Sequence, residues 1–191
     1  MKKCIFLFFF FCLLFVVLFL PDLVEAQSYL VGNSSTNPFY SSQRGLCRDN
    51  SNIIHISYLN TTSQIVYANS SDNGATWIYL TLSSGGTYGT PTIDCSGNNI
   101  TISYHDESPV TDKAIVYYST NSGSTWVNST AVSLNFVRNP FVVRKGDVIH
   151  IVYANIASGS DNLNYINSTN GGITWGSSIV IIPNPEVSTD Y

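Results

Sequence analysis

The sequence has few charged residues. They make up 10% of the 191 residues, against about 25% in ordinary soluble domains. Methionine occurs once, at position 1. A coiled coil or a helical bundle needs abundant Ala, Glu, Lys and Leu, so this composition argues against both. The net charge of −4 and the pI of 5.1 provide no basic surface, so we expect no nucleic-acid partner.

Hydrophobic residues, by contrast, make up 44% of the chain and can bury a core. Part of this content lies in the apolar run 5–20, which follows two lysines and ends at a proline. This pattern predicts a secretory signal peptide over 1–26, cleaved after Ala26. The alternative is an uncleaved signal anchor, since the run nearly spans a bilayer. We therefore expect residues 27–191 to be secreted or extracytoplasmic, with membrane contact only through a retained signal segment.

Cys47 and Cys95 are the cysteines that remain outside the signal segment. An even pair in an oxidising compartment suggests a disulfide, and two free buried thiols are the alternative. No ligands lie at metal-binding spacing around these cysteines or around His55 and His150. We expect the two histidines to be packed inside the fold, and we expect no metal and no cofactor.

Six Asn-x-Ser/Thr sequences are candidate N-glycosylation sites on an exported chain. A chain rich in Asn, Ser and Thr also forms such sequences by chance. They begin at Asn33, Asn60, Asn69, Asn99, Asn128 and Asn167.

An eight-residue motif occurs three times, and its tryptophans Trp77, Trp126 and Trp175 are spaced by 49 residues. Between the copies, β-branched and aromatic residues alternate with polar ones, which predicts strands. In the second repeat we expect strands over 92–95, 99–104, 113–119 and 125–132. Four strands in a repeat of this length are typical of a β-propeller blade.

The motif falls between the third and fourth strands of each repeat, so it is expected to form a hairpin turn. An Asp or Asn side chain there accepts hydrogen bonds from backbone N–H groups just ahead, and the following Gly provides a positive φ. The Trp then buries its ring. Asp72 is replaced by Asn121 and Asn170 in the later copies, which fits a structural role and not a catalytic acid. The structural residues expected in the three turns are Ser70, Asp72, Gly74, Thr76, Trp77, Ser119, Asn121, Gly123, Thr125, Trp126, Ser168, Asn170, Gly172, Thr174 and Trp175.

This motif resembles the Asp box, or bacterial neuraminidase repeat, of the sialidase superfamily. The resemblance covers nearly all of residues 27–191 and implies an all-β, sialidase-like β-propeller. It implies a fold and not an activity, because functional sites differ on a shared fold. In sialidases these turns lie away from the active face. The resemblance and the topology therefore direct the search to the opposite connections, where the ligand-face candidates are His105, Asp106, Glu107, Asp112, Arg138 and Asp161.

Sialidases use three arginines to hold the substrate carboxylate, together with a Tyr–Glu pair and an Asp. Residues 27–191 contain four arginines, and the Phe-Arg-Ile-Pro motif is absent; Arg44 occupies the comparable strand. Only weak catalytic candidates remain: Arg138, Glu107, Asp106 and Tyr88, with Arg44 and Asp49 also considered. The simpler interpretation is that these are solvated loop charges. The sequence thus favours a glycan- or protein-binding scaffold without complete catalytic machinery. The alternative is a fragment of an exo-α-sialidase or a related glycoside hydrolase.

The 49-residue phase also predicts the organisation of the chain. We expect blades at about 41–83, 90–133 and 139–182, with 28–33 as an outer strand of a closing blade. Propellers need about four to eight blades, so three cannot close a ring. We therefore expect a partial propeller that is a fragment or that needs further blades or self-association, beside a glycan or an extracellular protein as ligand.

Overall fold

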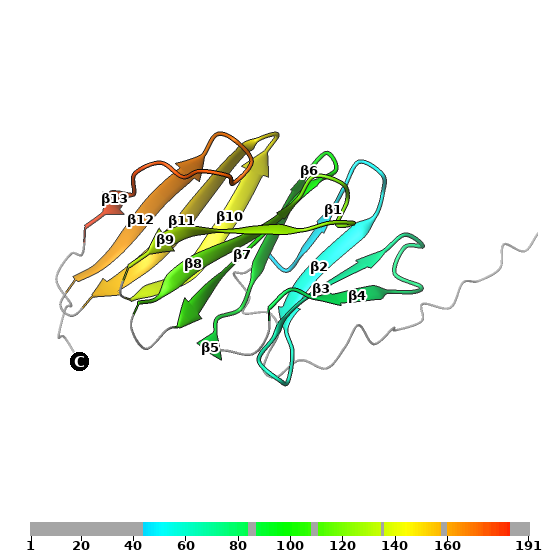
Figure 1. The fold of residues 1–191 in the computed structure, drawn as a ribbon, viewed down its shortest axis with the longest axis horizontal. Helices are drawn as coiled ribbons and strands as arrows, with labels where there is room; N and C mark the ends of the chain where they lie inside the picture. The colour runs from blue at the N-terminus through cyan, green and yellow to red at the C-terminus, as the bar shows by residue number, and fades with distance from the viewer. Residues whose placement is uncertain (1–43, 84–86, 108–110, 135, 158–159, 184–191) are drawn as a thin grey trace, which may run out of the picture.

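The computed structural model describes residues 44–83, 87–107, 111–134, 136–157 and 160–183. The signal segment and the expected outer strand 28–33 lie outside the described residues. Within the described ranges the regular secondary structure consists of β-strands (Figure 1). No helix among them is long and apolar enough to cross a membrane.

The strands form three antiparallel sheets, which follow one another along the chain (Figure 1). The first is β1 (Leu46–Arg48), β2 (Ile54–Leu59), β3 (Ile65–Ser70) and β4 (Ile78–Thr81), in that order. The second has the order β5-β7-β8-β9, with β6 paired to β7; its strands are β5 (Thr87–Tyr88), β6 (Thr92–Ser96), β7 (Asn99–Glu107), β8 (Lys113–Ser119) and β9 (Val127–Ser133). The third is β10 (Val137–Lys145), β11 (Val148–Ala157), β12 (Ser160–Ser168) and β13 (Ile179–Ile182). These sheets are three blades of a partial β-propeller, which confirms the predicted fold class.

Two strand boundaries of the second repeat differ from the prediction by more than one residue. The fourth strand begins at Val127 and not at residue 125, because the Thr125 N–H and the Trp126 indole are both bonded within the preceding turn. The second strand continues past residue 104 to Glu107. It can do so because β8 pairs with one edge of this extension and the short strand β5 pairs with the other.

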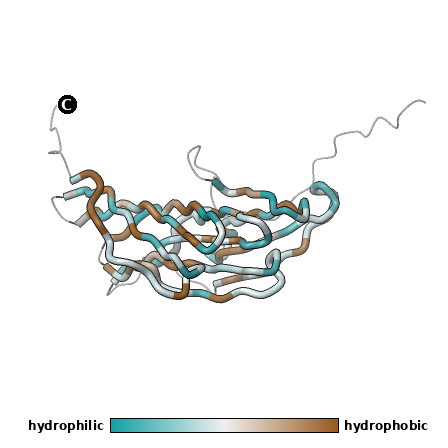
Figure 2. The backbone as a smooth tube through the Cα atoms, turned by 90° about the horizontal axis from the view of Figure 1, so that it is seen from above, coloured by the Kyte–Doolittle hydropathy of each residue, from teal (hydrophilic) through white to brown (hydrophobic). Residues whose placement is uncertain are grey.

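Apolar and polar residues alternate along the strands (Figure 2), so each blade offers an apolar face to its neighbour. Between the first and second blades, Tyr67 is buried in a cluster with Ile65, Ile100 and Ile102, against which Trp126 packs. The rings of Tyr67 and Trp126 meet edge to face at 4.7 Å, a favourable aromatic geometry. The turn containing Trp126 therefore packs against the preceding blade.

The second and third blades meet in the same way. A cluster of Val116, Val142, Ile149 and Ile151 fills the space between them, with Trp175 packed against it. The indole N–H of Trp175 donates to Ser129 Oγ at 3.1 Å, and Ser129 Oγ donates to the carbonyl of Gly172 at 2.7 Å. At both interfaces the tryptophan of a turn thus packs against the preceding blade, while its indole N–H bonds differently.

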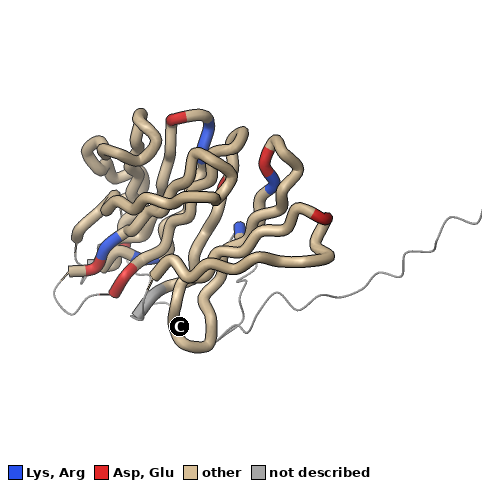
Figure 3. The backbone as a smooth tube through the Cα atoms, turned by 45° about the vertical axis from the view of Figure 1, so that its right-hand side comes forward, with Lys and Arg blue, Asp and Glu red and all other residues tan. Residues whose placement is uncertain are grey.

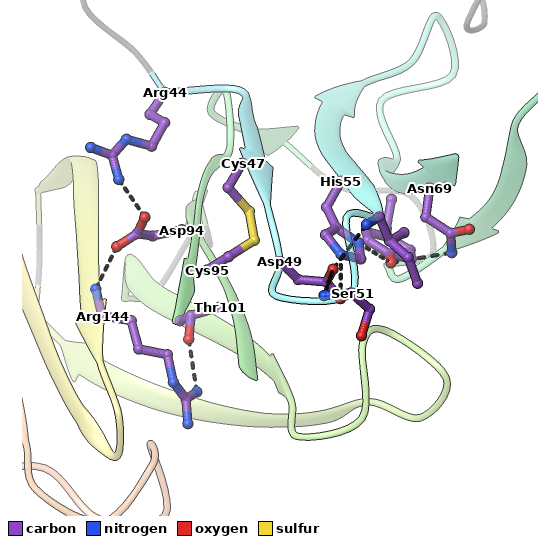
Figure 4. The surroundings of a disulfide bond; sticks show 12 residues. Arg44, Cys47, Asp49, Ser51, His55, Asn69, Asp94, Cys95, Thr101 and Arg144 are labelled. Carbon is purple, nitrogen blue, oxygen red and sulfur yellow. Dashed lines mark hydrogen bonds and ion pairs between the residues drawn. A yellow bond between two sulfur atoms is a disulfide. The ribbon is translucent and has the colours of Figure 1, made fainter. Parts of the chain in front are cut away.

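A disulfide between Cys47 and Cys95 joins the first two blades (Figure 4). The Cα atoms are 5.7 Å apart, and 48 residues separate the two cysteines. Beside it, Asp94 pairs with the Arg44 guanidinium and accepts a hydrogen bond from the Arg144 backbone N–H at 2.7 Å (Figure 4). Asp94 therefore links its own blade to residues from both of its neighbours.

Two glycines at equivalent turn positions provide a test of this packing. Gly74 and Gly123 both have positive φ, +92° and +82°. A Cβ on Gly123 would lie 2.0 Å from the Tyr67 hydroxyl, whereas one on Gly74 would lie 3.8 Å from Trp77. Gly74→Ala should lower the free energy of unfolding by about 1–2 kcal/mol through backbone strain. Gly123→Ala should cost a further ~1–3 kcal/mol through overpacking. Equal losses in denaturant titrations of the two variants would contradict this account.

Candidate functional site

The three repeated turns lie between the third and fourth strands of each blade. In the first turn, Asp72 Oδ1 accepts hydrogen bonds from Ser70 Oγ and from the Thr76 N–H, both at 2.8 Å. Thr76 Oγ1 donates to Asp72 Oδ2 at 2.6 Å, and Ser70 Oγ accepts the Gly74 N–H at 2.7 Å. The Trp77 indole N–H reaches the Gly74 carbonyl at 3.1 Å. The carboxylate thus organises the turn, and its bonds, chiefly those from Thr76, lower the pKa of Asp72 to about 2.

Asparagine forms the same turn in the later repeats. Asn121 Oδ1 accepts the Thr125 N–H at 2.9 Å, and Asn170 Oδ1 accepts the Thr174 N–H at 2.9 Å. The difference lies at the threonine hydroxyl. Thr125 Oγ1 accepts a hydrogen bond from Asn121 Nδ2, whereas Thr76 Oγ1 donates to Asp72. A hydroxyl can do either, so these turns need an oxygen acceptor and not a negative charge.

The opposite end of the blades carries a charged cluster, here called the rim cluster: His105, Glu107, Asp112 and Arg138. Arg138 Nη1 pairs with Asp112 Oδ2, and Arg138 Nε lies 3.4 Å from Glu107 Oε1. Glu107 Oε1 also lies 3.5 Å from His105 Nε2. Topology explains the meeting, because β7 ends, β8 begins and β10 begins at this end of the blades. Figure 3 shows that the charged residues lie mainly at the strand ends and that most of the chain consists of other residues.

Local bonds hold the rim cluster in place. Asp112 Oδ2 accepts the Phe136 N–H at 2.9 Å, and Arg138 Nη1 donates to the Val137 carbonyl at 2.8 Å. Nη1 and Nε of Arg138 therefore face groups of its own chain. Of the two carboxylates, Asp112 is nearly buried, while the Glu107 side chain is 37% exposed. Glu107 is the member of the cluster best placed to meet a ligand.

His105 forms the buried base of the rim cluster. The backbone N–H of Asn139 donates to His105 Nδ1, with 3.3 Å between the two nitrogens. Gly89 packs directly against the imidazole ring, since a Cβ on Gly89 would lie 1.8 Å from a ring atom. Burial lowers the pKa of His105 below its usual value. The positive charge of Arg138 lowers this pKa further, while Glu107 acts in the opposite direction. The imidazole is therefore neutral at pH 7 and accepts the Asn139 hydrogen bond.

Several of the predicted candidates lie in strands and not, as predicted, in loops. His105, Asp106, Glu107 and Arg138 were expected in loops but lie in strands β7 and β10, because the strands extend to the end of the blade. Tyr88 lies in β5, opposite Asp106 in the ladder. Asp161 is an exposed residue of β12 in the third blade. Among the described residues, Asp106 and Asp161 make no ion pair with the rim cluster.

The arginines of the described residues do not gather in one place. Arg44 pairs with Asp94 near the disulfide, and Arg48 donates to Asn73 Oδ1 at 2.8 Å at the end that carries the turns. Arg144 is buried between blades and donates to Thr101 Oγ1 at 3.0 Å. Arg138 is thus the one arginine of the described segments in the rim cluster.

The sequence did not predict the buried polar group that His55, Tyr67 and Asp49 form together. His55 Nδ1 lies 2.7 Å from the Tyr67 hydroxyl, and His55 Nε2 lies 3.3 Å from Asp49 Oδ2 (Figure 4). His55 is fully buried between the first two blades, and its burial lowers its pKa against the opposing effect of Asp49. His150 and Tyr165 repeat the pair at 2.8 Å. Tyr67 and Tyr165 are two repeat lengths apart, so the repeat phase was a signal that could have found both pairs.

The candidate glycosylation sites differ in their surroundings. Asn128 is exposed on β9. Asn60 and Asn69 use their amides within the fold, donating to Gln64 Oε1 at 3.0 Å and to the Tyr67 hydroxyl at 3.2 Å. Asn99 and Asn167 are partly buried in strands, and Asn33 lies outside the described residues. In the part of the chain that the structure describes, no group of three or more His, Cys, Asp or Glu side chains could hold a metal.

The sequence matches no protein-family model and no curated protein. Solved structures with a similar fold include an ulvan lyase described as a new family of polysaccharide lyase, with 17% identity and a TM-score of 0.63 over 81% of this chain and 41% of the lyase. A Penicillium chrysogenum α-L-arabinanase has 13% identity and a TM-score of 0.60 over 82% of this chain and 54% of the enzyme. A Hadza microbial sialidase has 15% identity and a TM-score of 0.51 over 69% of this chain and 32% of the sialidase.

These likenesses establish a shared β-propeller fold, seen in sialidase and in other glycan-active enzymes. The chain spans less than half of the ulvan lyase and about half of the arabinanase. The structural comparison therefore shows the fold alone, a partial β-propeller.

The depressed pKa of Asp72 predicts an acid-dependent loss of stability in the first turn. Its usual pKa is 3.8 and its folded value is about 2, so its stabilising effect is complete above pH 4 and is lost as the pH falls toward 2. Asp72→Asn keeps the acceptor oxygen and should be less sensitive to acid over this interval. Urea unfolding of wild type and variant at several pH values would measure the difference. An unchanged difference in stability across the interval would count against the prediction.

The rim cluster predicts a coupled histidine titration. Removing the charge with Arg138→Gln should raise the pKa of His105, because the arginine lowers it and the two freed carboxylates favour imidazolium. An NMR titration of the His105 ring in wild type and variant would show this as a rise in midpoint. Arg48→Gln, at the other end of the blades, should leave the midpoint unchanged. A midpoint that stays constant or falls in Arg138→Gln would refute the arrangement.

Proposed function

We propose that this chain is part of an exported, sialidase-like propeller whose turns are Asp boxes and whose rim cluster binds glycans. The observation that carries the proposal is the position of the rim cluster. It lies at the blade end opposite the turns, and it presents a half-exposed Glu107 carboxylate that Arg138 and His105 hold in place. A fixed carboxylate is a strong acceptor for sugar hydroxyls. The fold shared with several glycan-active enzymes supports a carbohydrate ligand.

The electrostatics of the rim favour a neutral sugar over an acidic one. Clamping the carboxylate of a sialic acid requires free guanidinium groups. Arg138 already pairs with Asp112 and Glu107, and the other described arginines lie elsewhere. With His105 neutral, the cluster carries one positive and two negative charges, so it repels an anionic ligand. This supports a binding module and argues against sialidase chemistry.

The alternative function is that of a glycoside hydrolase of which this chain is a fragment. Its support is the pair of carboxylates, Glu107 and Asp112, that share one arginine, because most glycosidases work with two acidic residues. Under this alternative Glu107 is the acid or base, and further groups come from additional blades. Tyr88 and Asp106 remain candidates for such a role at the same end of the second blade.

Export is a further part of the proposal. Its support is the apolar segment at residues 5–20 together with the disulfide between Cys47 and Cys95, since disulfides persist in oxidising compartments. Among the acceptor sequences, Asn128 is the proposed glycan carrier, because its side chain is exposed on β9.

The binding proposal can be tested with a glycan array and one matched pair of variants. Glu107→Gln should weaken binding of a neutral glycan identified on the array by ~10-fold, the effect of losing a charge-assisted hydrogen bond. Asp147→Asn removes a carboxylate at the opposite end, where Asp147 is 75% exposed, and should have no effect. Array binding that responds equally to both variants would reject the rim cluster as the site.

The same preparation distinguishes the two functions. A binding module should leave fluorogenic sialosides and arabinosides unhydrolysed. Turnover abolished by Glu107→Gln and retained in Asp147→Asn would establish the hydrolase instead.

A further inference from the structure

The first and third blades carry the same histidine–tyrosine pair on the same face. His55 stacks on Tyr67 with ring centroids 5.8 Å apart, and His150 stacks on Tyr165 at 5.9 Å. Both histidines use Nδ1 to meet the tyrosine hydroxyl, at 2.7 and 2.8 Å. The strand registers agree as well, since His55 faces Asn69 and His150 faces Asn167. The two blades therefore present equivalent surfaces at equivalent positions.

Within the described residues, only one of these equivalent surfaces is covered. In the first blade His55 is 0% and Tyr67 is 1% exposed. In the third blade His150 and Tyr165 are both partly exposed. Val143, which faces His150 in the ladder, is 41% exposed. This surface of the third blade, with Val143, His150 and Tyr165, is called the open face below.

The cover of the first blade is the Trp-containing turn of the second. Gly123 lies directly against the Tyr67 hydroxyl, and Trp126 meets the Tyr67 ring at 4.7 Å. The next interface repeats this, because a Cβ on Gly172 would lie 3.1 Å from Tyr118 of the second blade. The same contact therefore occurs at both interfaces, where a Gly–Trp turn covers the face of the preceding blade.

The turn of the first blade has no such contact within the described residues. Gly74 meets only its own Trp77 there, at 3.8 Å from a built Cβ. The described segments thus leave a face of the third blade uncovered and the turn of the first blade without a contact of this kind. The open face of the third blade and the turn of the first blade are complementary, because neighbouring blades within the chain meet through the same two kinds of surface.

We propose that the open face binds the Gly74–Trp77 turn of a second copy of this chain, and that two copies close one ring. The described residues of each copy form three blades, so those of two copies supply six, within the four to eight blades of a propeller, and those of three copies exceed this range. The contact is heterologous, and a ring of two copies uses both open surfaces of each chain. It also places two rim clusters around one axis, which makes the partner copy part of the glycan-binding end. That last consequence rests on the proposed function, whereas the ring itself does not.

The disulfide specifies the geometry of the proposed interface. Cys47 faces His55 in its ladder, and Val143 faces His150, so Val143 occupies the position of Cys47. In the second blade, Cys95 faces Ile100, and Ile100 faces Ser119, the first residue of the turn. In the first blade, Arg48 faces Ile54, and Ile54 faces Ser70, the first residue of its turn. Arg48 therefore occupies the position of Cys95. In the ring, Val143 of one copy therefore lies beside Arg48 of the other. The native Cys47–Cys95 bridge spans 5.7 Å between Cα atoms, and the same separation is expected there.

The experiment is an engineered copy of the native bridge. The double variant Val143→Cys/Arg48→Cys should form a covalent species of two chains on air oxidation, separated again by a reducing agent. Val127→Cys/Arg48→Cys is the matched control, because Val127 is 55% exposed on the second blade and lies away from the open face. It should remain a single chain. Both variants leave Cys47, Cys95 and the rim cluster intact.

Light scattering on the unmodified protein provides the second measurement. The solution mass should be twice the chain mass found by mass spectrometry, and Val143→Lys should halve it while Val127→Lys does not. A folded monomer at every concentration, a ladder of larger species, or equal cross-linking in the control would overturn the ring. Because these readouts contain no glycan, they are independent of whether the rim cluster binds one.

Discussion

The structure depends on one contact, in which the Gly–Trp turn of a blade packs against the aromatic face of the blade before it. Gly123 is required there because its φ is positive and because the Tyr67 hydroxyl fills the space of a side chain. The hydrogen bonds of Ser119 and Asn121 fix the turn, so the indole of Trp126 lies where the ring of Tyr67 meets it. Local turn chemistry and packing between blades are thus parts of one interaction.

Features encoded within a single repeat could be predicted from the sequence. The 49-residue phase located the three turns, and the four-strand pattern gave the fold. Features that depend on two repeats were harder to predict. The cysteine count allowed both a disulfide and free thiols, and the structure joins Cys47 to Cys95 because two first strands lie side by side. Within a single blade, the His55–Tyr67 pair was not predicted either, because it depends on the register between β2 and β3.

The rim cluster shows where prediction from sequence succeeds and where it ends. Topology correctly brought His105, Glu107, Asp112 and Arg138 to one end of the blades. The sequence could not show that Arg138 is already paired with both carboxylates, because this requires the distance between the starts of β8 and β10. That pairing changes the chemistry of the site, since an arginine already paired with two carboxylates is less able to hold the carboxylate of an acidic sugar.

The same charges explain why the rim can be functional while the turns need not be. Asp72 uses its carboxylate for bonds within the turn, and asparagine replaces it twice without changing the geometry. Glu107 is held from one side by Arg138 and His105, while its side chain remains 37% exposed. A carboxylate that is fixed but not consumed by its own fold retains acceptor capacity for an external hydroxyl. Position and unused hydrogen-bonding capacity, more than residue type, therefore distinguish the candidate site from the structural motif.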